Sequence, residues 1–237
     1  MKKTIISCVL FLTAVTAFSQ TPMKTAAEAK LSASDLAVKI ADRILATTTY
    51  EFKNTKTGKT YKSVKNLPLD MNVKVACKYN NWHYTNGVTH IALMELADKT
   101  GAKKYDDYVL KNMNFVFNEG NLDFFKKQYE QAMKNEGWYG VRKLSWHMIF
   151  RGKRLDDNGP MGASLIDLQM KHPNNSFLNY INETAEHLNY GEPRLADGTI
   201  ARIWPHENTI WADDAFMAIS FLARMAKMTG DMSYIND

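Results

Sequence analysis

Two acidic motifs contain the side chains of this sequence that are best suited to acid–base chemistry. The first reads Leu-Asp-Asp-Asn-Gly-Pro-Met-Gly over residues 155–162, and the second reads Trp-Pro-His-Glu-Asn-Thr-Ile-Trp-Ala-Asp-Asp over residues 204–214. Each holds two adjacent aspartates where a loop is expected to become a helix, because the first contains Pro160 and an apolar run follows the second. A carboxyl group can give a proton to a substrate and take one from water, so both pairs are candidate acid–base groups.

Helix capping is the simpler interpretation of both pairs, because acidic residues at a helix start satisfy free backbone N–H groups and favour the helix dipole. Capping does not explain the residues around the pairs, however. These are Arg202, Trp204, His206 and Trp211 near the second pair, and Arg151, Lys153 and Arg154 before the first. Flat aromatic faces pack on the C–H surfaces of sugar rings, and planar guanidinium groups bind carboxylates in a bidentate manner. The motifs therefore favour a carbohydrate site.

A third cluster, Trp-His-Tyr-Thr-Asn-Gly over residues 82–87, has a similar composition and stands where another helix is expected to begin. Trp82 and Tyr84 are candidates for contact with a sugar. Ordinary packing between helices explains the two rings equally well on residue type alone. Both interpretations of this cluster stay open.

The first residues of the chain predict export from the cytoplasm. Lys2 and Lys3 precede an apolar run over residues 5–18 that ends in small and polar residues, as in a secretory signal peptide. We expect residues 1–20 to be the signal peptide, residues 21–33 to be a polar linker, and the protein to be periplasmic or secreted in a Gram-negative bacterium. The apolar run is shorter than the roughly 20 residues that a membrane helix needs, and no later stretch approaches that length. We expect no membrane contact after cleavage.

The composition predicts one packed domain without an internal disulfide. Cys77 is the only cysteine after the expected signal peptide, and 45% of the residues are hydrophobic. The 217 residues that remain (237 minus 20) can bury a sizeable core. The formal charge of +5 falls to +3 without Lys2 and Lys3, and the other lysines are dispersed. A clustered basic stripe is missing, so we expect no nucleic-acid partner.

Loosely repeated helical hairpins are the main indication of architecture. In three segments an apolar helix closes on a short polar or glycine-containing turn, and an aromatic residue follows where the next helix begins. The segments are 91–105, 165–177 and 221–234. Gly101 and Gly230 suit the left-handed position just past a helix end. We expect an all-α fold of antiparallel helix pairs.

The segment before these repeats is predicted to be less regular. Ser34 and Asp35 indicate the start of a first helix. Residues 50–70 contain Gly58 and Pro68 among many Thr and Lys, which predicts a long irregular segment. Regular helices are expected to resume near residue 72, and no convincing alternating strand pattern is present.

Repeated hairpins can stack in an open solenoid or close into a toroid of two concentric helix layers, and their spacing does not separate the two. The connections over residues 137–160 and 191–214 are long and rich in aromatic, acidic and glycine residues. Such loops are unlike the tight turns of a solenoid and commonly carry function at one end of a barrel. The loops therefore favour a toroid.

The motifs together resemble those of glycoside hydrolase family 105, the unsaturated rhamnogalacturonyl hydrolases, and of the neighbouring family 88, the unsaturated glucuronyl hydrolases. The resemblance covers roughly residues 82–237. It depends on Trp82 to Gly87, on Leu155-Asp156 with Pro160, and on Trp211-Ala212-Asp213 followed by Met217, and the turn from Thr229 to Tyr234 is also typical. Three motifs in the right order make the resemblance fairly specific.

The resemblance implies an (α/α)6 barrel over residues 34–237. Six hairpins at a 57-residue spacing would need roughly 340 residues, so we expect a barrel that is truncated at its carboxyl end. It also implies substrates left by polysaccharide lyases, such as pectin-type rhamnogalacturonan oligosaccharides whose terminal uronic acid has a C4–C5 double bond. An Asp protonates C4, and water activated by the same carboxylate adds at C5. No metal and no organic cofactor is implied.

Residue roles follow from the resemblance position by position. Asp213 matches the catalytic acid and base, and Asp156 matches the second acidic residue of the site. Trp211 matches the ring that packs on the unsaturated sugar. Further candidate substrate contacts are His206, Arg202, Tyr84 and Trp82. Asp157 and Asp214 stay open as alternatives within each pair, because neighbouring helix residues point about 100° apart.

Two other classes of protein compete with an enzyme. A non-catalytic, carbohydrate-binding fragment of a helical toroid would keep the aromatic residues without turnover. The presence of both Asp156 and Asp213 in their motifs argues against it, because a decayed site should lose its acid first. A helical repeat protein that binds peptides would show more regular and shorter repeats.

Overall fold

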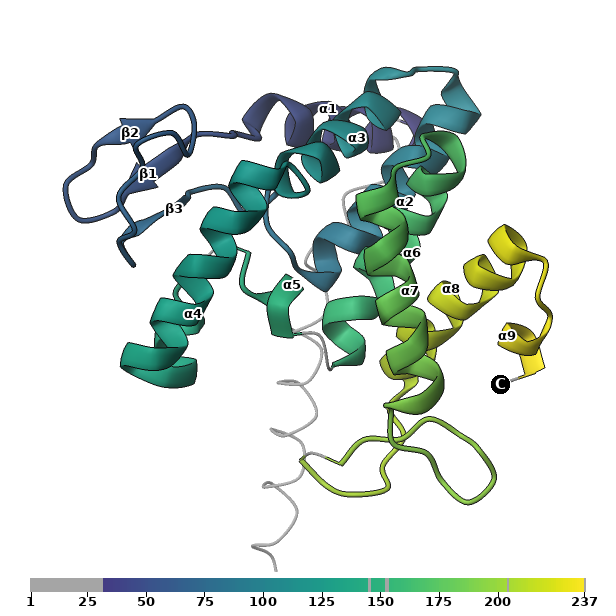
Figure 1. Cartoon of the computed structure of the whole chain (residues 1–237). Coiled ribbons are helices and arrows are strands. Elements are labelled where there is room, and N and C mark those ends of the chain that lie inside the picture. Colours follow the sequence, from purple (N-terminus) through teal and green to yellow (C-terminus); the bar gives the residue numbers. More distant parts are fainter. Residues whose placement is uncertain (1–31, 145, 152–153, 204, 237) are drawn as a thin grey trace, which may run out of the picture. The chain divides into compact units, whose positions relative to one another are not determined.

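The computed structural model describes residues 32–236 except 145, 152, 153 and 204. The expected signal peptide at 1–20 and most of the expected linker lie outside these residues. Helices make up most of the described chain, so the predicted all-α class is confirmed (Figure 1). The longer helices are α1 (Ala33–Thr47), α2 (Tyr84–Thr100), α3 (Lys104–Val116), α4 (Glu119–Val141), α6 (Leu155–Lys171), α7 (Asn175–Tyr190) and α8 (Ala212–Thr229). Two single-turn helices are α5 (Met148–Arg151) and α9 (Ser233–Asn236).

The chain divides within α1 into two units, one ending at Ile40 and one beginning at Ala41. In the described part of the first unit, Ser32 and Asp35 form a reciprocal cap at the start of α1. The Ser32 hydroxyl donates to Asp35 Oδ2 at 2.7 Å, and the Asp35 N–H donates to Ser32 Oγ at 3.1 Å. The helix therefore starts slightly earlier than the Ser34 and Asp35 pattern predicts.

A small antiparallel sheet replaces part of the predicted irregular segment. Its strands are β1 (Phe52–Asn54), β2 (Thr60–Tyr61) and β3 (Val73–Val75), in the order β2-β1-β3. Phe52 is fully buried and lies opposite both Tyr61 and Val75. The prediction that helices resume near residue 72 is wrong, since β3 lies there and α2 begins at Tyr84. Strands of two or three residues are too short to give a detectable alternation.

The predicted hairpin turns are confirmed at both glycines. Gly101 ends α2 with φ 70° and Gly230 ends α8 with φ 76°, and the N–H of each donates to the carbonyl four residues earlier. After the first turn, the buried Tyr105 ring of α3 points its hydroxyl at Asp42 Oδ1, at 3.0 Å. The left-handed conformation that glycine accepts without strain thus reverses the chain where the sequence predicts.

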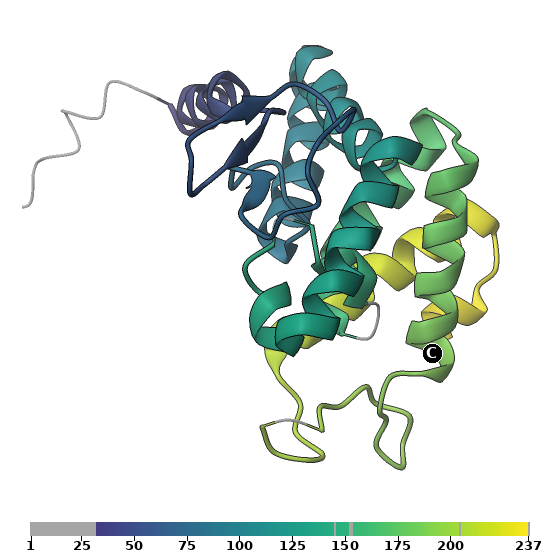
Figure 2. The same ribbon diagram turned by 60° about the vertical axis from the view of Figure 1, so that its left-hand side comes forward.

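Helix pairs in the second unit form two layers. Helices α2, α6 and α8 lie side by side, and each is followed by a partner that packs against it, α3, α7 and α9 respectively (Figures 1 and 2). Helix α6 lies between α2 and α8, and it is buried over most of its length. This inner and outer arrangement of alternating helices is that of an (α/α)6 toroid, as predicted.

Glycines permit the close approach of the inner helices. A Cβ on Gly87 of α2 would overlap the Pro160 backbone of α6, and a Cβ on Gly162 would lie 2.7 Å from the Phe221 ring of α8. The first contact joins the opening turns of α2 and α6, and the second joins the middles of α6 and α8. Gly159 approaches Met217 one turn earlier on both α6 and α8, and Lys171 contacts Asp98 in the last turns of α6 and α2. The inner helices are therefore parallel, and their first turns meet at one end of the layer.

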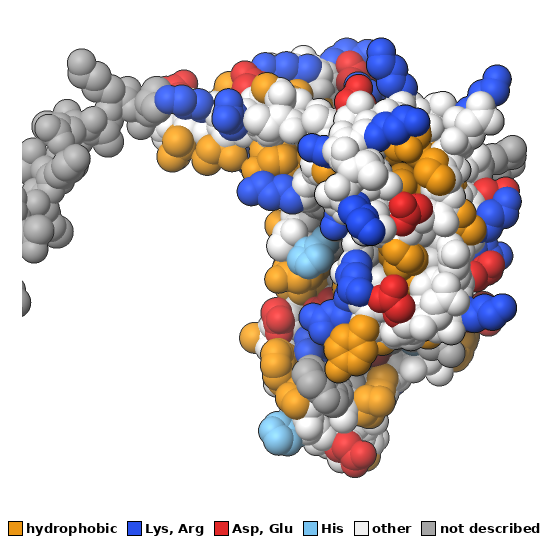
Figure 3. Space-filling model, turned by 90° about the vertical axis from the view of Figure 1, so that its left-hand side faces the viewer, with side chains coloured by type: hydrophobic (Ala, Val, Ile, Leu, Met, Phe, Trp, Pro, Cys, Tyr) orange, Lys and Arg blue, Asp and Glu red, His pale blue; other side chains and the backbone are white. Residues whose placement is uncertain are grey.

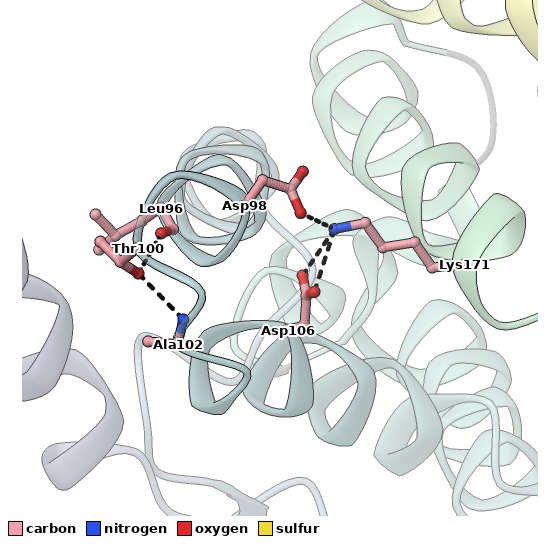
Figure 4. A network of polar contacts seen from close by, with 6 residues as sticks. All are labelled: Leu96, Asp98, Thr100, Ala102, Asp106 and Lys171. Atoms are coloured by element: carbon pink, nitrogen blue, oxygen red, sulfur yellow. Dashed lines mark hydrogen bonds and ion pairs between the residues drawn. The ribbon is translucent and has the colours of Figure 1, made fainter.

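The other end of the inner layer is held by an ion-pair network (Figure 4). Lys171 Nζ, in the last turn of α6, lies 2.9 Å from Asp98 Oδ1 of α2 and 3.1 Å from Asp106 Oδ1 of α3. These side chains are partly exposed, so each pair contributes about 1 kcal/mol or less. Within the described residues, none of the helices combines the length and the hydrophobicity that a membrane crossing requires.

Candidate active site

The three motifs found in the sequence meet at the amino-terminal end of the inner helices. They precede or open α2 at Tyr84, α6 at Leu155 and α8 at Ala212. Trp82 Nε1 donates to the Asp157 carbonyl oxygen at 2.8 Å, which ties the cluster at residues 82–87 to the motif at residues 155–162. Segments that are more than 70 residues apart in sequence thus build one site.

Arg202 links the motif at residues 155–162 to the motif at residues 204–214. Its Nη2 donates to Asp214 Oδ1 at 2.6 Å, and its Nε donates to the other carboxylate oxygen of Asp214. Asp156 Oδ1 lies 3.5 Å from the same Nη2. The guanidinium also stacks over the Trp211 ring, 4.2 Å from its centroid. The hydrogen bonds to Asp214 raise the pKa of Arg202, so the guanidinium stays charged and joins the first turns of α6 and α8.

A hairpin-like segment between α7 and α8 places Arg202. The Ala201 N–H donates to the Pro193 carbonyl at 2.8 Å, and the Arg202 N–H donates to the Thr209 carbonyl at 2.8 Å. The segment turns at Gly198, whose φ of 91° favours glycine. The stretch that contains Ala201 and Arg202 is thus held by backbone hydrogen bonds to Pro193 before it and to Thr209 after it. These bonds set the position from which the Arg202 side chain reaches Asp214.

A cavity of about 350 Å³ opens beside this network. It is at the small end of the range of ligand sites in proteins. The charged and titratable residues in its wall are Arg154, Asp156, His187, Glu192, Arg202 and Asp214. Leu155, Pro193, Ile200 and Ala201 supply apolar surface. The wall contains carboxylate acceptors and guanidinium groups, so it suits a polar ligand that can donate hydrogen bonds.

In each aspartate pair, one carboxylate is buried and paired with an arginine, and the other is more exposed. Asp157 and Asp214 are buried and paired with Arg151 and Arg202 respectively. Burial raises the pKa of Asp157 to about 6, although Arg151 opposes the rise. Asp156 keeps 31% of its side chain exposed, and Asp213 is exposed.

Within the described residues, no hydrogen bond or ion pair holds the Asp213 carboxylate. Asp214, rather than Asp213, lines the cavity, but both of its oxygens are taken by Arg202. A carboxylate that is engaged in this way is poorly placed to exchange a proton with a substrate. Asp213, one helix position away, is the member of the pair that is accessible to a ligand.

The other residues predicted to contact the substrate differ in how exposed they are. Trp211 is 41% exposed and Tyr84 is 40% exposed, and Tyr84 packs on His83 with ring centroids 4.5 Å apart. His206 is exposed but does not line the cavity. Trp82 is fully buried, so in this structure its ring offers no exposed face. Trp204 lies outside the described residues.

Two cavity residues were missed in the sequence. His187 is in the last turn of α7 and Glu192 follows the helix, and their side chains contact each other at 3.0 Å. A five-residue spacing across a helix end is a weak signal, because the approach depends on how the chain leaves the helix. His83 was not a candidate either; it caps α2 outside the cavity lining, and burial lowers its pKa while Asp156 opposes that effect. No group of three or more metal-binding side chains is present among the described residues.

The fold and the site define an all-α toroid protein with an acidic, aromatic site at the start of its inner helices. The sequence profile described as Glycosyl Hydrolase Family 88 matches residues 55–237, and the chain belongs to this family. The resemblance noted in the motifs is thereby confirmed.

Among solved structures, the chain is similar to a possible member of the GH105 family from Klebsiella pneumoniae subsp. pneumoniae. The two chains share 12% sequence identity with a TM-score of 0.49, over 87% of this chain and 45% of that chain. The chain thus spans less than half the length of that protein. No curated protein matches the sequence.

Proposed function

We propose that the protein is a glycoside hydrolase that releases a terminal 4,5-unsaturated uronic acid from lyase-generated oligosaccharides. Membership of glycosyl hydrolase family 88 supports this proposal. The observation that carries the assignment of residues is the division of the aspartate pairs. Asp157 and Asp214 are buried and paired with arginines, whereas the Asp156 carboxylate is partly exposed and that of Asp213 is exposed, at the same end of the inner helices.

The proposed reaction needs one carboxyl group and one water molecule. Asp213 gives its proton to C4 of the double bond, and positive charge develops at C5 beside the ring oxygen. Water adds at C5 and returns a proton to the Asp213 carboxylate. The hemiketal then opens the ring and leaves C1 as a hemiacetal, which loses the rest of the oligosaccharide. Atoms and protons balance without a second catalytic carboxylate or a cofactor.

Neighbouring residues have supporting roles in this proposal. Asp156, 3.5 Å from Arg202, accepts hydrogen bonds from sugar hydroxyl groups. Trp211 packs its exposed ring on the sugar, and Tyr84 provides a further aromatic contact. Arg202 is tied to Asp214, so we assign it to positioning rather than to direct binding of the substrate carboxylate. A rhamnogalacturonan-type disaccharide is the proposed substrate.

Loss of ultraviolet absorbance by the conjugated double bond tests the proposal directly. Wild-type protein should remove the absorbance of a lyase-generated rhamnogalacturonan disaccharide, and Asp213→Asn should reduce the rate by roughly 100-fold or more. Chelation of divalent metals should leave the rate unchanged. A folded wild type that binds the disaccharide without turnover would instead identify a non-catalytic carbohydrate-binding protein.

We also propose that residues 1–20 direct export and are removed. The protein would then meet oligosaccharides in the periplasm after lyases have acted outside. Amino-terminal sequencing of protein from a periplasmic fraction tests this, and an intact Met1 on cytoplasmic protein would contradict it.

A further inference from the structure

Two cavity residues have no part in the proposed reaction. His187 Nε2 lies 3.0 Å from Glu192 Oε1, and the side chains are only 16% and 9% exposed. They join the last turn of α7 to the first residues of the hairpin-like segment that leads to Arg202. A polar pair that is so well buried makes a defined contact at a cost in desolvation, which calls for an explanation.

The backbone holds the pair from its other side. The N–H groups of Gly191 and Glu192 both donate to the His187 carbonyl, at 2.7 and 3.0 Å. A Cβ on Gly191 would overlap the imidazole Nδ1 and lie 2.9 Å from its Cε1. Because Gly191 has φ −108°, which any residue can adopt, this glycine is needed for space and not for backbone freedom. The imidazole is thus confined between Gly191 and the Glu192 carboxylate.

A backbone hydrogen bond connects the neighbour of Glu192 to the neighbour of Arg202. Pro193 follows Glu192, Ala201 precedes Arg202, and the Ala201 N–H donates to the Pro193 carbonyl at 2.8 Å. Arg194 Nη2 donates to the Leu188 carbonyl of α7 at 3.0 Å, which anchors the same stretch. Nine residues lie between Glu192 and Arg202 in sequence, but the backbone hydrogen bond from Ala201 to Pro193 places the stretches that hold them side by side.

The charge on Glu192 is also linked electrostatically to the charges on His187 and Asp214. Burial raises the pKa of Glu192, His187 opposes the rise, and the nearby Asp214 carboxylate adds to it. Asp214 is the carboxylate that holds Arg202. Moving or removing Glu192 therefore changes both the path of the hairpin-like segment and the field around Asp214.

We infer that His187 and Glu192 are positioning residues. Their contact anchors the hairpin-like segment to the end of α7, and so sets the guanidinium of Arg202 between Asp156 and Asp214 and over the Trp211 ring. The effect on turnover rests on the proposed function, but the placement of Arg202 does not.

The Trp211 indole reports the position of Arg202, because the guanidinium lies 4.2 Å from its ring centroid. In a ¹H–¹⁵N spectrum of the full chain, the Trp211 indole signal is identified by its loss in Trp211→Phe. We expect Glu192→Ala and Gly191→Ala to move this signal. Glu192→Gln should move it less, since an amide still hydrogen-bonds to the imidazole. Asp197→Asn, on the same segment near its turn and exposed, is the matched control and should leave the signal in place.

Kinetics add a second readout. Glu192→Ala and Gly191→Ala should lower kcat by roughly 10- to 100-fold with a smaller change in KM, and Glu192→Gln should recover part of the loss. An unmoved Trp211 signal in both Glu192→Ala and Gly191→Ala would overturn the inference, as would an equal shift in Asp197→Asn. If Glu192→Ala fails to fold, Gly191→Ala and Glu192→Gln decide the matter. An inert wild type with the expected shifts would refute the proposed function and leave the positioning role standing.

Discussion

Gly159 of α6 lies so close to Met217 of α8 that a Cβ at residue 159 would be 2.6 Å from the Met217 carbonyl oxygen. This approach brings the start of α6 against the start of α8. The aspartate pairs stand two to four residues before these positions, so the same contact sets the separation of the two acidic motifs. The geometry of the site thus depends on a residue that has no functional group.

Substitution of Gly159 should separate the two helices. Gly159→Ala places a methyl group against rigid backbone, and we expect a loss of about 2–4 kcal/mol in the free energy of unfolding, measured in urea. Gly120→Ala is the control: its nearest neighbour is a Val64 methyl group at 3.3 Å, and alanine favours the helix. Its unfolding free energy should change by about 1 kcal/mol or less. Equal stability of the two variants would show that α6 and α8 are not in tight contact.

Substitutions of Asp213 and Asp214 should differ in their effect on the stability of the protein as well as on its activity. Asp214→Asn removes a buried charge that accepts two hydrogen bonds from Arg202, and should cost about 2–4 kcal/mol. Asp213→Asn alters an exposed side chain, and its unfolding free energy should stay within about 0.5 kcal/mol of wild type. Denaturation of both variants at one pH makes the comparison. A large loss in Asp213→Asn would mean that Asp213 has a structural role.

Substitution of Trp82 should affect mainly stability, whereas substitution of Trp211 should affect mainly sugar binding. Trp82→Phe removes the hydrogen bond to the Asp157 carbonyl and leaves a cavity in the core, so we expect about 2–4 kcal/mol of destabilisation. Trp211→Ala removes an exposed ring and should weaken binding of the sugar by roughly 10-fold with little loss of stability. Calorimetric titration and urea unfolding of each variant test the pair. The assignment fails if Trp211→Ala binds sugar as the wild type does.

Stability should fall in mild acid because of His90. This histidine is fully buried, and burial lowers its pKa from 6.5 to about 4. Since the unfolded chain takes up the proton at higher pH, the stabilising effect is complete above pH 6.5 and is lost as the pH falls through 4. The loss approaches about 3 kcal/mol. Urea unfolding at pH 7.5 and 4.5 should show a smaller pH effect in His90→Gln than in wild type, and identical pH effects would exclude His90 as the cause.

Several features were predictable because they depend on local chemistry. Gly101 and Gly230 end their helices in the left-handed conformation that their place after an apolar helix indicates. The family was predicted from motifs at residues 82–87, 155–162 and 204–217, because the residue types that carry chemistry are visible in sequence. The short β1 strand was not predicted, since three residues with Phe52 inward give too little pattern.

The sequence by itself determined that paired aspartates, tryptophans and arginines occur at helix starts. Only the tertiary structure decided what each one faces. Trp82 and Trp211 have the same side chain, yet one is buried between helices and the other is exposed beside Arg202. Asp213 and Asp214 are adjacent, yet a guanidinium from a loop 12 residues away engages only one of them. Burial and pairing depend on contacts between segments that are distant in the chain, and local sequence carries no record of those contacts.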